Sequence, residues 1–427
     1  MSISTLLMGL FRSLLLLVAI GSSTAVAAPQ VQPSERVETR VIVRSAPSSE
    51  ADRLGQLEPG ESAELVGDAP GWHQVRLPDG RIGYVSKAWT DILELVLDAA
   101  YTMHVIDVGT GLAIFVEGPD FTLLYDAGSN DDTDTGSPNR VLAYLRKVRP
   151  DLRSIDHVVL SHAHKDHLHL LPDIFDSYEI RHVWDSGRLF DRCGYRNFLQ
   201  KVAAETGAQY HSGWGSGGTH TFRFERCRSG ANAVTLQLES QLQRGPVNLG
   251  QGARMDFLYV DTEPHHDPNE NSLVVRLDLG TRRILLTGDA EGGRRDLWPG
   301  TPTADSVEGK LLACCRAALA ADLLVSGHHG STTSSRSDFL DAVGARAFVI
   351  SSGPYRYSGT SLPDAAVVQE YRRRGALWQT DYNDAACKVD RAKIGTDADG
   401  EAGGCDNIRA VISSSGQMQL SYHRVSD

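Results

Sequence analysis

SHAHKDH, residues 161–167, directly follows the apolar run HVVL. Four of its seven residues are His162, His164, Asp166 and His167. Imidazole nitrogens and carboxylate oxygens are ligands that zinc, manganese and iron accept. In a loop that leaves a strand, the alternate residues His162 and His164 can converge on one metal ion, and Asp166 and His167 then face a second. The stretch therefore predicts a site for two divalent metal ions.

Three other apolar runs end in residues that such a site needs. The run 284–286 is followed by Thr287-Gly288-Asp289, and a carboxylate at a strand end can bridge two cations. The run 323–325 is followed by Ser326 and Gly327 and then by His328 and His329. Asp126 follows the run Leu123 to Tyr125, and we expect its carboxylate to orient a ligand histidine.

The rest of the chain from about residue 100 alternates short apolar runs with amphipathic stretches. The predicted strands cover 103–106, 113–116, 122–125, 157–160, 273–277, 283–286, 323–325 and 348–350. The predicted helices cover 141–147, 195–205, 337–343 and 365–374. This mixture predicts a layered α/β domain over 100–427. Residues 36–92 instead show short strands with turn signals at Pro59-Gly60 and Asp79-Gly80, which predicts a small all-β barrel.

Composition bounds the class of protein. The chain has 427 residues, of which 41% are hydrophobic and 22% charged, with a formal net charge of −12. These values exclude a disordered chain, a collagen-like fibre and a small disulfide scaffold. A mean hydropathy of −0.25 argues against a protein with several membrane spans. The acidic balance argues against a broad, non-specific grip on nucleic acid.

The first residues are typical of an export signal. Arg12 precedes the apolar run 14–20, and small residues follow as far as an A-x-A-like cleavage site at Ala27. Residues 1–27 are therefore predicted to be a cleaved signal peptide, which makes the mature protein periplasmic or secreted and leaves it without a transmembrane segment. An uncleaved membrane anchor is the alternative.

The six cysteines suit an oxidising compartment. Cys193 and Cys227 flank one glycine-rich segment, and Cys387 and Cys405 flank another, so these two pairs are the predicted disulfides. The adjacent Cys314 and Cys315 are expected to be free buried thiols.

The H-x-H-x-D-H loop, the Thr-Gly-Asp stretch and the later strand-end histidine together resemble the metallo-β-lactamase superfamily. Within it, the chain is most similar to the extracellular hydrolase domain of ComEC competence proteins, over 101–425. The matching stretches are 104–109, 123–128, 269–273, 285–291 and 327–331. The resemblance implies a four-layer αββα sandwich with metals at the strand ends.

The resemblance also implies a role for each ligand. His162 and His164 would hold the first metal, Asp166 and His167 the second, and Asp289 would bridge them. His328 is expected as a further ligand of the second metal, with His329 as the alternative. The superfamily's third histidine on the first metal has two candidates here, His265 and His266.

Two stretches depart from the ComEC-like pattern. Tyr357-Ser358-Gly359-Thr360 stands where Tyr-Gly-His-Pro is usual, and Thr110-Gly111-Leu112 stands where Gln-Gly-Asp is usual. Both are expected to face the substrate, so the departures bear on nuclease activity.

A second resemblance covers the N-terminal barrel. The segments 43–47, 71–72 and 80–85 are similar to the bacterial Src-homology-3-like domain. Domains of that family bind cell-wall peptides or serve as spacers, and both roles stay open for residues 36–92.

These observations predict an exported binuclear hydrolase. A hydroxide that bridges two divalent ions, zinc first and manganese or iron as alternatives, would attack a phosphorus or carbonyl centre. Asp166 is the expected catalytic residue, which orients the nucleophile and takes up its proton. The ComEC likeness favours a phosphodiester, as a small molecule or an oligonucleotide-like chain. The alternatives are an ester, lactone or amide hydrolase at the cell envelope, and a degenerate hydrolase that serves as an extracytoplasmic binding protein.

Overall fold

The computed structural model describes residues 30–423, apart from 35, 38, 94–98, 216, 228–229, 358 and 381–404. The predicted signal peptide, residues 1–27, lies outside the described residues. In the part of the chain that is described, no helix is both long enough and apolar enough to cross a bilayer.

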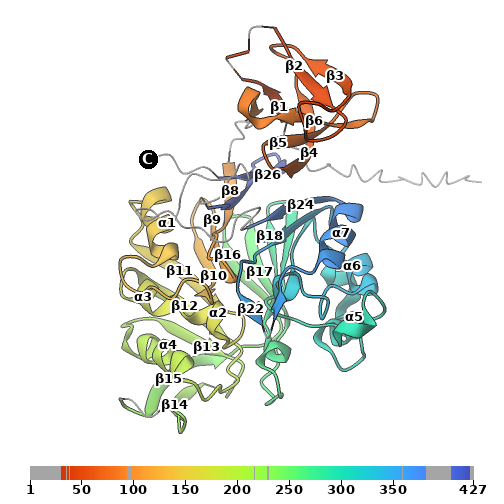
Figure 1. Cartoon of the computed structure of the whole chain (residues 1–427). Coiled ribbons are helices and arrows are strands. Elements are labelled where there is room, and N and C mark those ends of the chain that lie inside the picture. Colours follow the sequence, from red (N-terminus) through yellow and green to blue (C-terminus); the bar gives the residue numbers. More distant parts are fainter. Residues whose placement is uncertain are drawn as a thin grey trace, which may run out of the picture.

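The N-terminal region is a seven-stranded all-β unit, drawn at the top of Figure 1. Its strands are β1 (Gln30–Pro33), β2 (Val41–Arg44), β3 (Arg53–Leu57), β4 (Ala63–Ala69), β5 (Trp72–Arg76), β6 (Ile82–Ser86) and β7 (Thr90–Leu93). Val43, Val75 and Val85 are fully buried in its small core. Gly60 and Gly80 occupy the predicted turns with φ of 89° and 84°, a conformation that favours glycine. The predicted all-β barrel is confirmed.

The remaining chain is built on two large sheets. The first has the order β14-β15-β13-β12-β11-β10-β9-β8-β25-β26. Its strands are β8 (Ala99–Val105), β9 (Gly111–Glu117), β10 (Thr122–Ser129), β11 (Ser154–Leu160), β12 (Glu179–Asp185), β13 (Gln209–Ser212), β14 (Gly218–Arg223), β15 (Ala233–Gln241), β25 (Ile408–Ser413) and β26 (Met418–Tyr422). The second has the order β16-β17-β18-β19-β20-β21-β24. Its strands are β16 (Gly245–Gly250), β17 (Ala253–Tyr259), β18 (Val274–Leu279), β19 (Arg282–Leu286), β20 (Leu323–Val325), β21 (Ala347–Ile350) and β24 (Ala376–Gln379).

Helices cover the outer face of each sheet (Figure 1). The first sheet carries α1 (Arg140–Val148), α2 (Lys165–Leu168), α3 (Leu171–Phe175) and α4 (Cys193–Ala204). The second carries α5 (Val307–Cys315), α6 (Ser337–Val343) and α7 (Ala365–Arg374). One apolar core lies under the helices on each sheet. Another lies between the two sheets, where Leu123, Val159 and Val275 are fully buried. These layers confirm the predicted αββα sandwich.

Strand direction brings the predicted ligands to one edge. Strand β10 runs parallel to β11, with Tyr125 opposite Val159, and β19 runs parallel to β20, with Leu286 opposite Val325. Because parallel strands end on the same side, the segments after all four strands can meet between the two sheets.

The disulfides confirm one of the cysteine predictions and contradict another. The Cys193–Cys227 pair is confirmed, with a Cα–Cα distance of 5.1 Å. Cys405 is buried, but Cys387 lies outside the described residues, so the Cys387–Cys405 pair stays a prediction.

The prediction of free buried thiols at Cys314 and Cys315 is wrong, because these two residues form a disulfide with each other. Both stand at the end of α5 near the surface, where Cys315 leaves helical geometry with φ −150° and ψ 30°. The guanidinium of Arg244 donates to both sulfurs, at 3.2 Å and 2.7 Å.

Candidate metal centre

The first predicted ligands lie where β11 ends and α2 begins. His162 and His164 occupy the connecting loop, and Asp166 and His167 lie in the single turn of α2. Helix α2 rests directly on the end of β10, because a Cβ at Gly128 would lie 2.4 Å from the carbonyl carbon of Asp166. Only glycine permits this approach, which fixes the loop against the sheet.

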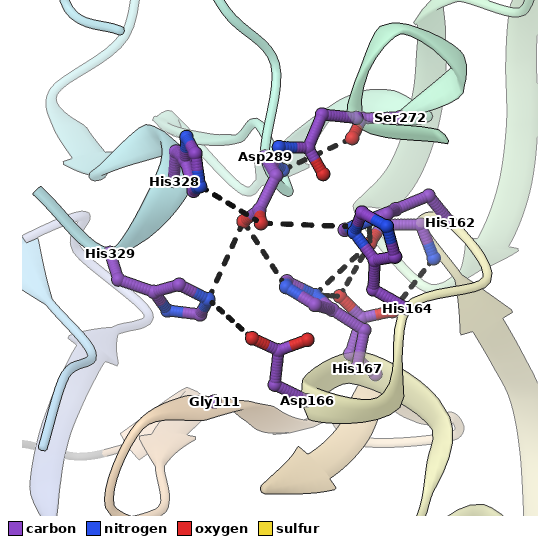
Figure 2. Close-up of polar contacts among 12 residues, drawn as sticks. Gly111, His162, His164, Asp166, His167, Ser272, Asp289, His328 and His329 are labelled. Atoms are coloured by element: carbon purple, nitrogen blue, oxygen red, sulfur yellow. Dashed lines mark hydrogen bonds and ion pairs between the residues drawn. The ribbon is translucent and has the colours of Figure 1, made fainter. Parts of the chain in front are cut away.

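One group of side chains consists of His162, His164 and Asp289. His162 Nε2 lies 3.1 Å from His164 Nδ1 and 3.7 Å from Asp289 Oδ2. Figure 2 shows these rings turned toward the Asp289 carboxylate, which follows β19. Three ligand atoms from two sheets therefore converge, and the predicted first-metal residues are brought together.

A second group consists of Asp166, His167 and His329. His329 Nε2 lies 3.6 Å from Asp166 Oδ2 and 3.6 Å from Asp289 Oδ1, and His167 Nε2 lies 3.1 Å from Asp289 Oδ1. The two oxygens of Asp289 thus face different groups, as Figure 2 shows at its centre. This is the geometry expected of a bridging carboxylate.

Hydrogen bonds on the far side of the rings fix their direction. His167 Nδ1 lies 2.8 Å from Asp126 Oδ2, and the same carboxylate accepts from the backbone N–H and the hydroxyl of Ser161. His329 Nδ1 donates to the Ser351 carbonyl at 2.9 Å. Each bond leaves Nε2 free to face the centre. The prediction that Asp126 orients a ligand histidine is confirmed in its contact with His167.

Three buried polar atoms at the centre form ion pairs of 3.1 Å and 3.6 Å with one another but no well-aligned hydrogen bond among the described residues. They are His167 Nε2, Asp289 Oδ1 and His329 Nε2. Buried polar atoms are normally paired, and leaving one unpaired costs free energy. Imidazole nitrogens and carboxylate oxygens in this arrangement fit a divalent metal ion, which would satisfy all three atoms.

The electrostatics of these side chains point the same way. Burial lowers the pKa of His167, but Asp289 and Asp126 outweigh that effect and raise it well above its usual value. Burial raises the pKa values of Asp166 and Asp289, but the neighbouring imidazoles hold both below the usual range. The carboxylates therefore favour positive charge at the centre.

His328 takes a different position from the one expected. Its Nδ1 lies 2.9 Å from Glu291 Oε1 and 2.8 Å from Thr333 Oγ1, and its Nε2 is 3.9 Å from Asp289 Oδ2. Both His328 and His329 have positive φ, 47° and 52°, so the chain turns sharply between them. This turn directs only His329 into the second group, and the alternative residue occupies the place expected of His328.

Neither candidate for the third histidine joins a group. His265 Nε2 lies 3.0 Å from Asp261 Oδ2 and its Nδ1 lies 3.2 Å from Glu270 Oε2, while His266 is exposed. The nearest acidic atom from this loop is Asp267 Oδ1, 3.8 Å from His164 Nε2. The loop therefore closes one side of the centre with a carboxylate rather than an imidazole.

The sequence did not single out three residues that hold the site carboxylates. Asn130 Nδ2 donates to Asp166 Oδ2 at 2.9 Å, and the Tyr357 hydroxyl donates to the same oxygen. Ser272 Oγ accepts from the backbone N–H of Asp289 at 3.1 Å. Burial and the Asp166 charge raise the pKa of Tyr357, so it remains a donor. Tyr357 lies in the stretch that departs from the ComEC-like pattern, and this departure is the sequence feature that could have drawn attention to it.

Comparison with known proteins places these features in context. Residues 106–353 match the family described as the metallo-beta-lactamase superfamily, and residues 39–91 match the bacterial SH3 domain. Recombination protein 2 of Haemophilus influenzae is 24% identical over 273 residues, which cover 64% of this chain and 26% of that protein. Competence protein ComA of Neisseria gonorrhoeae is 33% identical over 138 residues, which cover 31% and 17%.

The chain thus spans about a quarter or less of the length of these two relatives. Among solved structures, the metallo-beta-lactamase fold protein YhfI from Bacillus subtilis is 13% identical, covers 66% of this chain and 96% of its own, and has a TM-score of 0.37. Both resemblances predicted from the sequence are confirmed by the family matches and the two relatives.

Proposed function

The chain belongs to the metallo-beta-lactamase superfamily, and on this premise we propose that it is an exported hydrolase that holds two divalent metal ions and cleaves a phosphodiester. Zinc is the first choice of metal, because imidazole nitrogens and carboxylate oxygens are its usual ligands in catalytic sites.

One observation carries the proposal. His167 Nε2, Asp289 Oδ1 and His329 Nε2 face one another, buried and without hydrogen-bond partners, at the end of two sheets. A degenerate site has no reason to retain three buried ligand atoms that lie close together and lack well-aligned hydrogen bonds within the described chain. The arrangement therefore favours a metal-dependent enzyme over a binding protein that has lost its activity.

The side chains divide the work. His162, His164 and Asp289 would hold one ion, and Asp166, His167 and His329 the other, with one oxygen of Asp289 toward each. Two bound ions supply a nucleophile from water near neutral pH and positive charge for the developing oxyanion.

We assign Asp166 the task of orienting that nucleophile and accepting its proton. Asn130 and Tyr357 both donate to Asp166 Oδ2, which holds the carboxylate in place and leaves Oδ1 for this task. Tyr357 and Asn130 are also hydrogen-bonded to each other at 3.0 Å, so the three groups form one closed unit.

The choice of phosphodiester is supported by the relatives, whose names refer to recombination and competence. A second candidate is hydrolysis of an ester, lactone or amide at the cell envelope. The match of residues 39–91 to the bacterial SH3 domain favours it, because domains of that kind include binders of cell-wall peptides.

Metal analysis of the mature protein is the first test. Purified protein is expected to carry close to two equivalents of zinc, manganese or iron. A ratio well under one after growth in metal-supplemented medium would refute the enzyme.

A substrate panel then separates the two candidates. Bis-p-nitrophenyl phosphate should turn over faster than any lactone or ester of the panel, and the reverse order would select the envelope candidate. Asp166→Asn should abolish turnover. The matched control is Asp151→Asn, because Asp151 is an exposed partner of Arg149 and precedes β11, whereas the site residues follow the other end of that strand. Equal rates for wild type and Asp166→Asn would refute the assignment of Asp166.

A further inference from the structure

The loop between β12 and α4, residues 186–192, lies beside the candidate metal centre. Its Phe190 ring packs edge-on against the ring of His164, with 5.7 Å between centroids. The guanidinium carbons of Arg188 and Arg192 lie 5.5 Å and 5.2 Å from the centroid of Phe190. Two cations and one aromatic ring therefore adjoin a residue of the first metal group.

The loop is held rigidly. The Cys193–Cys227 disulfide ties its end to a distant segment, and the Asp191 carboxylate accepts the backbone N–H of Arg226 at 3.1 Å and 3.2 Å. Gly187 starts the loop with φ 79°, where a Cβ would lie 2.0 Å from Ser212 Oγ. A loop fixed at both ends loses little entropy when it binds a ligand.

The two arginines keep hydrogen-bonding capacity that the protein does not use. Arg188 donates through Nη2 to the His265 carbonyl at 2.6 Å, but its buried Nε has no partner among the described residues. Arg192 is exposed, and its one side-chain hydrogen bond within the described chain runs from Nη1 to the Asp191 carbonyl. Neither arginine lies within salt-bridge distance of a described carboxylate, although the charge of Asp267 acts on Arg188 from farther away, in a protein whose net charge is −12.

Two exposed apolar side chains lie in or beside the same loop. Leu189 and Trp214 are 43% and 41% exposed, although large hydrophobic side chains are usually covered. Trp214 adjoins the start of the loop, since a Cβ at Gly187 would lie 2.7 Å from its backbone nitrogen. An exposed aromatic and aliphatic surface next to unpaired cations suits a ligand that is both charged and flat.

We propose that Arg188, Phe190 and Arg192 form a substrate subsite. It binds the part of the substrate that remains attached to the phosphorus when the leaving group departs, and this part carries an anionic ester group and a flat aromatic substituent. The arginines hold the anionic oxygens, and Phe190 with its apolar neighbours contacts the flat group. The proposal rests on the proposed function and sharpens it, because a neutral lactone or amide gives two arginines nothing to bind.

Two synthetic diesters test the subsite on the metal-loaded mature protein. Bis-p-nitrophenyl phosphate and methyl p-nitrophenyl phosphate share their charge and leaving group and differ in the retained group. Arg192→Ala should raise KM roughly tenfold for both, since charge-assisted hydrogen bonds are lost. Phe190→Ala should raise KM several-fold for the bis-aryl diester alone, about the size of one aromatic contact.

The matched control is Arg254→Ala, because Arg254 on β17 pairs with Asp278 on β18 and its side chain is 49% exposed. Metal content must equal that of wild type in every variant, which separates a lost subsite from a lost metal. Unchanged KM in both Arg192→Ala and Phe190→Ala, with wild type active on both diesters, would overturn the subsite and leave the proposed function standing.

If wild type hydrolyses neither diester, the proposed function falls, and binding decides the subsite on its own. Calorimetry with p-nitrophenyl phosphate should then show roughly tenfold weaker binding to Arg192→Ala than to wild type. Equal affinities would overturn the subsite.

Discussion

Two clusters of histidines differ in their surroundings: one lies where the ends of the two sheets meet, and the other lies on the first sheet alone. The metal-centre histidines are His162, His164, His167 and His329. The stacked histidines are His157 on β11, His182 on β12 and His211 on β13. The sequence alone offers imidazoles in both places.

The stacked histidines satisfy one another. His157 and His182 lie 4.9 Å apart between centroids, and His182 and His211 lie 5.5 Å apart, with near-parallel rings in both pairs. Trp184 stacks on His211 at 3.9 Å and donates through Nε1 to His157 Nδ1. No salt bridge joins any of the three to a described carboxylate. Their hydrogen-bond partners are the neutral side chains of Trp184, Ser240 and one another.

The carboxylates decide the difference. Burial, with a smaller contribution from the charge of His182, lowers the pKa values of His157 and His211 to about 4. At the metal centre, the carboxylates of Asp289 and Asp126 reverse the effect of burial and raise the pKa of His167. Clustered imidazoles become a metal site only where carboxylates face them and lone pairs remain unpaired.

Removing the bridging carboxylate should have the largest effect. Asp289→Asn takes away the negative charge shared by both groups, so metal content should fall by at least one equivalent and turnover by roughly 1,000-fold or more. Metal analysis and rate measurements check both. His211→Gln, in the stacked histidines, should leave metal content unchanged. Loss of metal in the His211 variant would erase the distinction between the clusters.

Much of the fold could be predicted because apolar runs mark buried strands. The run 323–325 coincides with β20, and the predicted helix 337–343 coincides with α6. The interior strands β12, β17 and β25 were not predicted, although they are largely buried, because polar residues interrupt their apolar runs. Strands β14 and β16 were also not predicted, because they lie at sheet edges and are mostly exposed or half-buried. Exposed strands lack the apolar signal on which the sequence prediction depends.

The ligand motifs of the candidate site could be predicted from the sequence. The residues that contact these motifs from elsewhere in the chain could not. The four residues of the SHAHKDH stretch and Asp289 meet as expected. The choice between His328 and His329 was not predictable, because it depends on a backbone turn with positive φ at both residues. Tyr357, in the short strand β22 (Arg356–Tyr357), and Asn130, directly after β10, reach Asp166 from distant parts of the sequence, and no local pattern reports such contacts.

The second largest expected effect, on metal content and turnover, comes from replacing His329 but not its neighbour His328. His329→Ala should cost one metal equivalent and roughly 100-fold in turnover, because it removes a ligand that faces Asp166 and Asp289. His328→Ala should retain both equivalents, since His328 pairs with Glu291. Metal analysis of the two variants side by side checks this, and metal loss in His328→Ala alone would reverse the assignment.

Acidification should affect the stacked histidines directly. The folded-state pKa of His157 is about 4, below its unfolded value near 6.5, so the unfolded chain binds the proton first. Its contribution to stability is complete above pH 6.5 and is lost as the pH falls toward 4, by about 2 to 3 kcal/mol between pH 7 and pH 4.5.

Denaturant unfolding of chelator-treated protein at both pH values measures this loss without interference from metal release. His157→Phe should lose correspondingly less stability than wild type, whereas the exposed variant His266→Gln should match wild type. An identical loss in wild type and His157→Phe would contradict the assignment of a buried neutral His157.

The smallest expected effect comes from replacing the residue that contacts Nδ1 of a histidine ring. Asp126 holds Nδ1 of His167 at 2.8 Å in the metal centre, and Ser240 holds Nδ1 of His211 at 2.9 Å in the stack. Asp126→Asn should weaken metal affinity roughly 10- to 100-fold, because the amide orients His167 without the charge that makes its Nε2 a strong donor. Ser240→Ala removes the equivalent partner from a histidine that binds no metal, so zinc affinity measured by competition with a chelator should equal that of wild type. If the two variants weakened zinc binding equally, the partner of Nδ1 would act through the stability of the whole sheet, and the contrast between the clusters would not lie in their carboxylates.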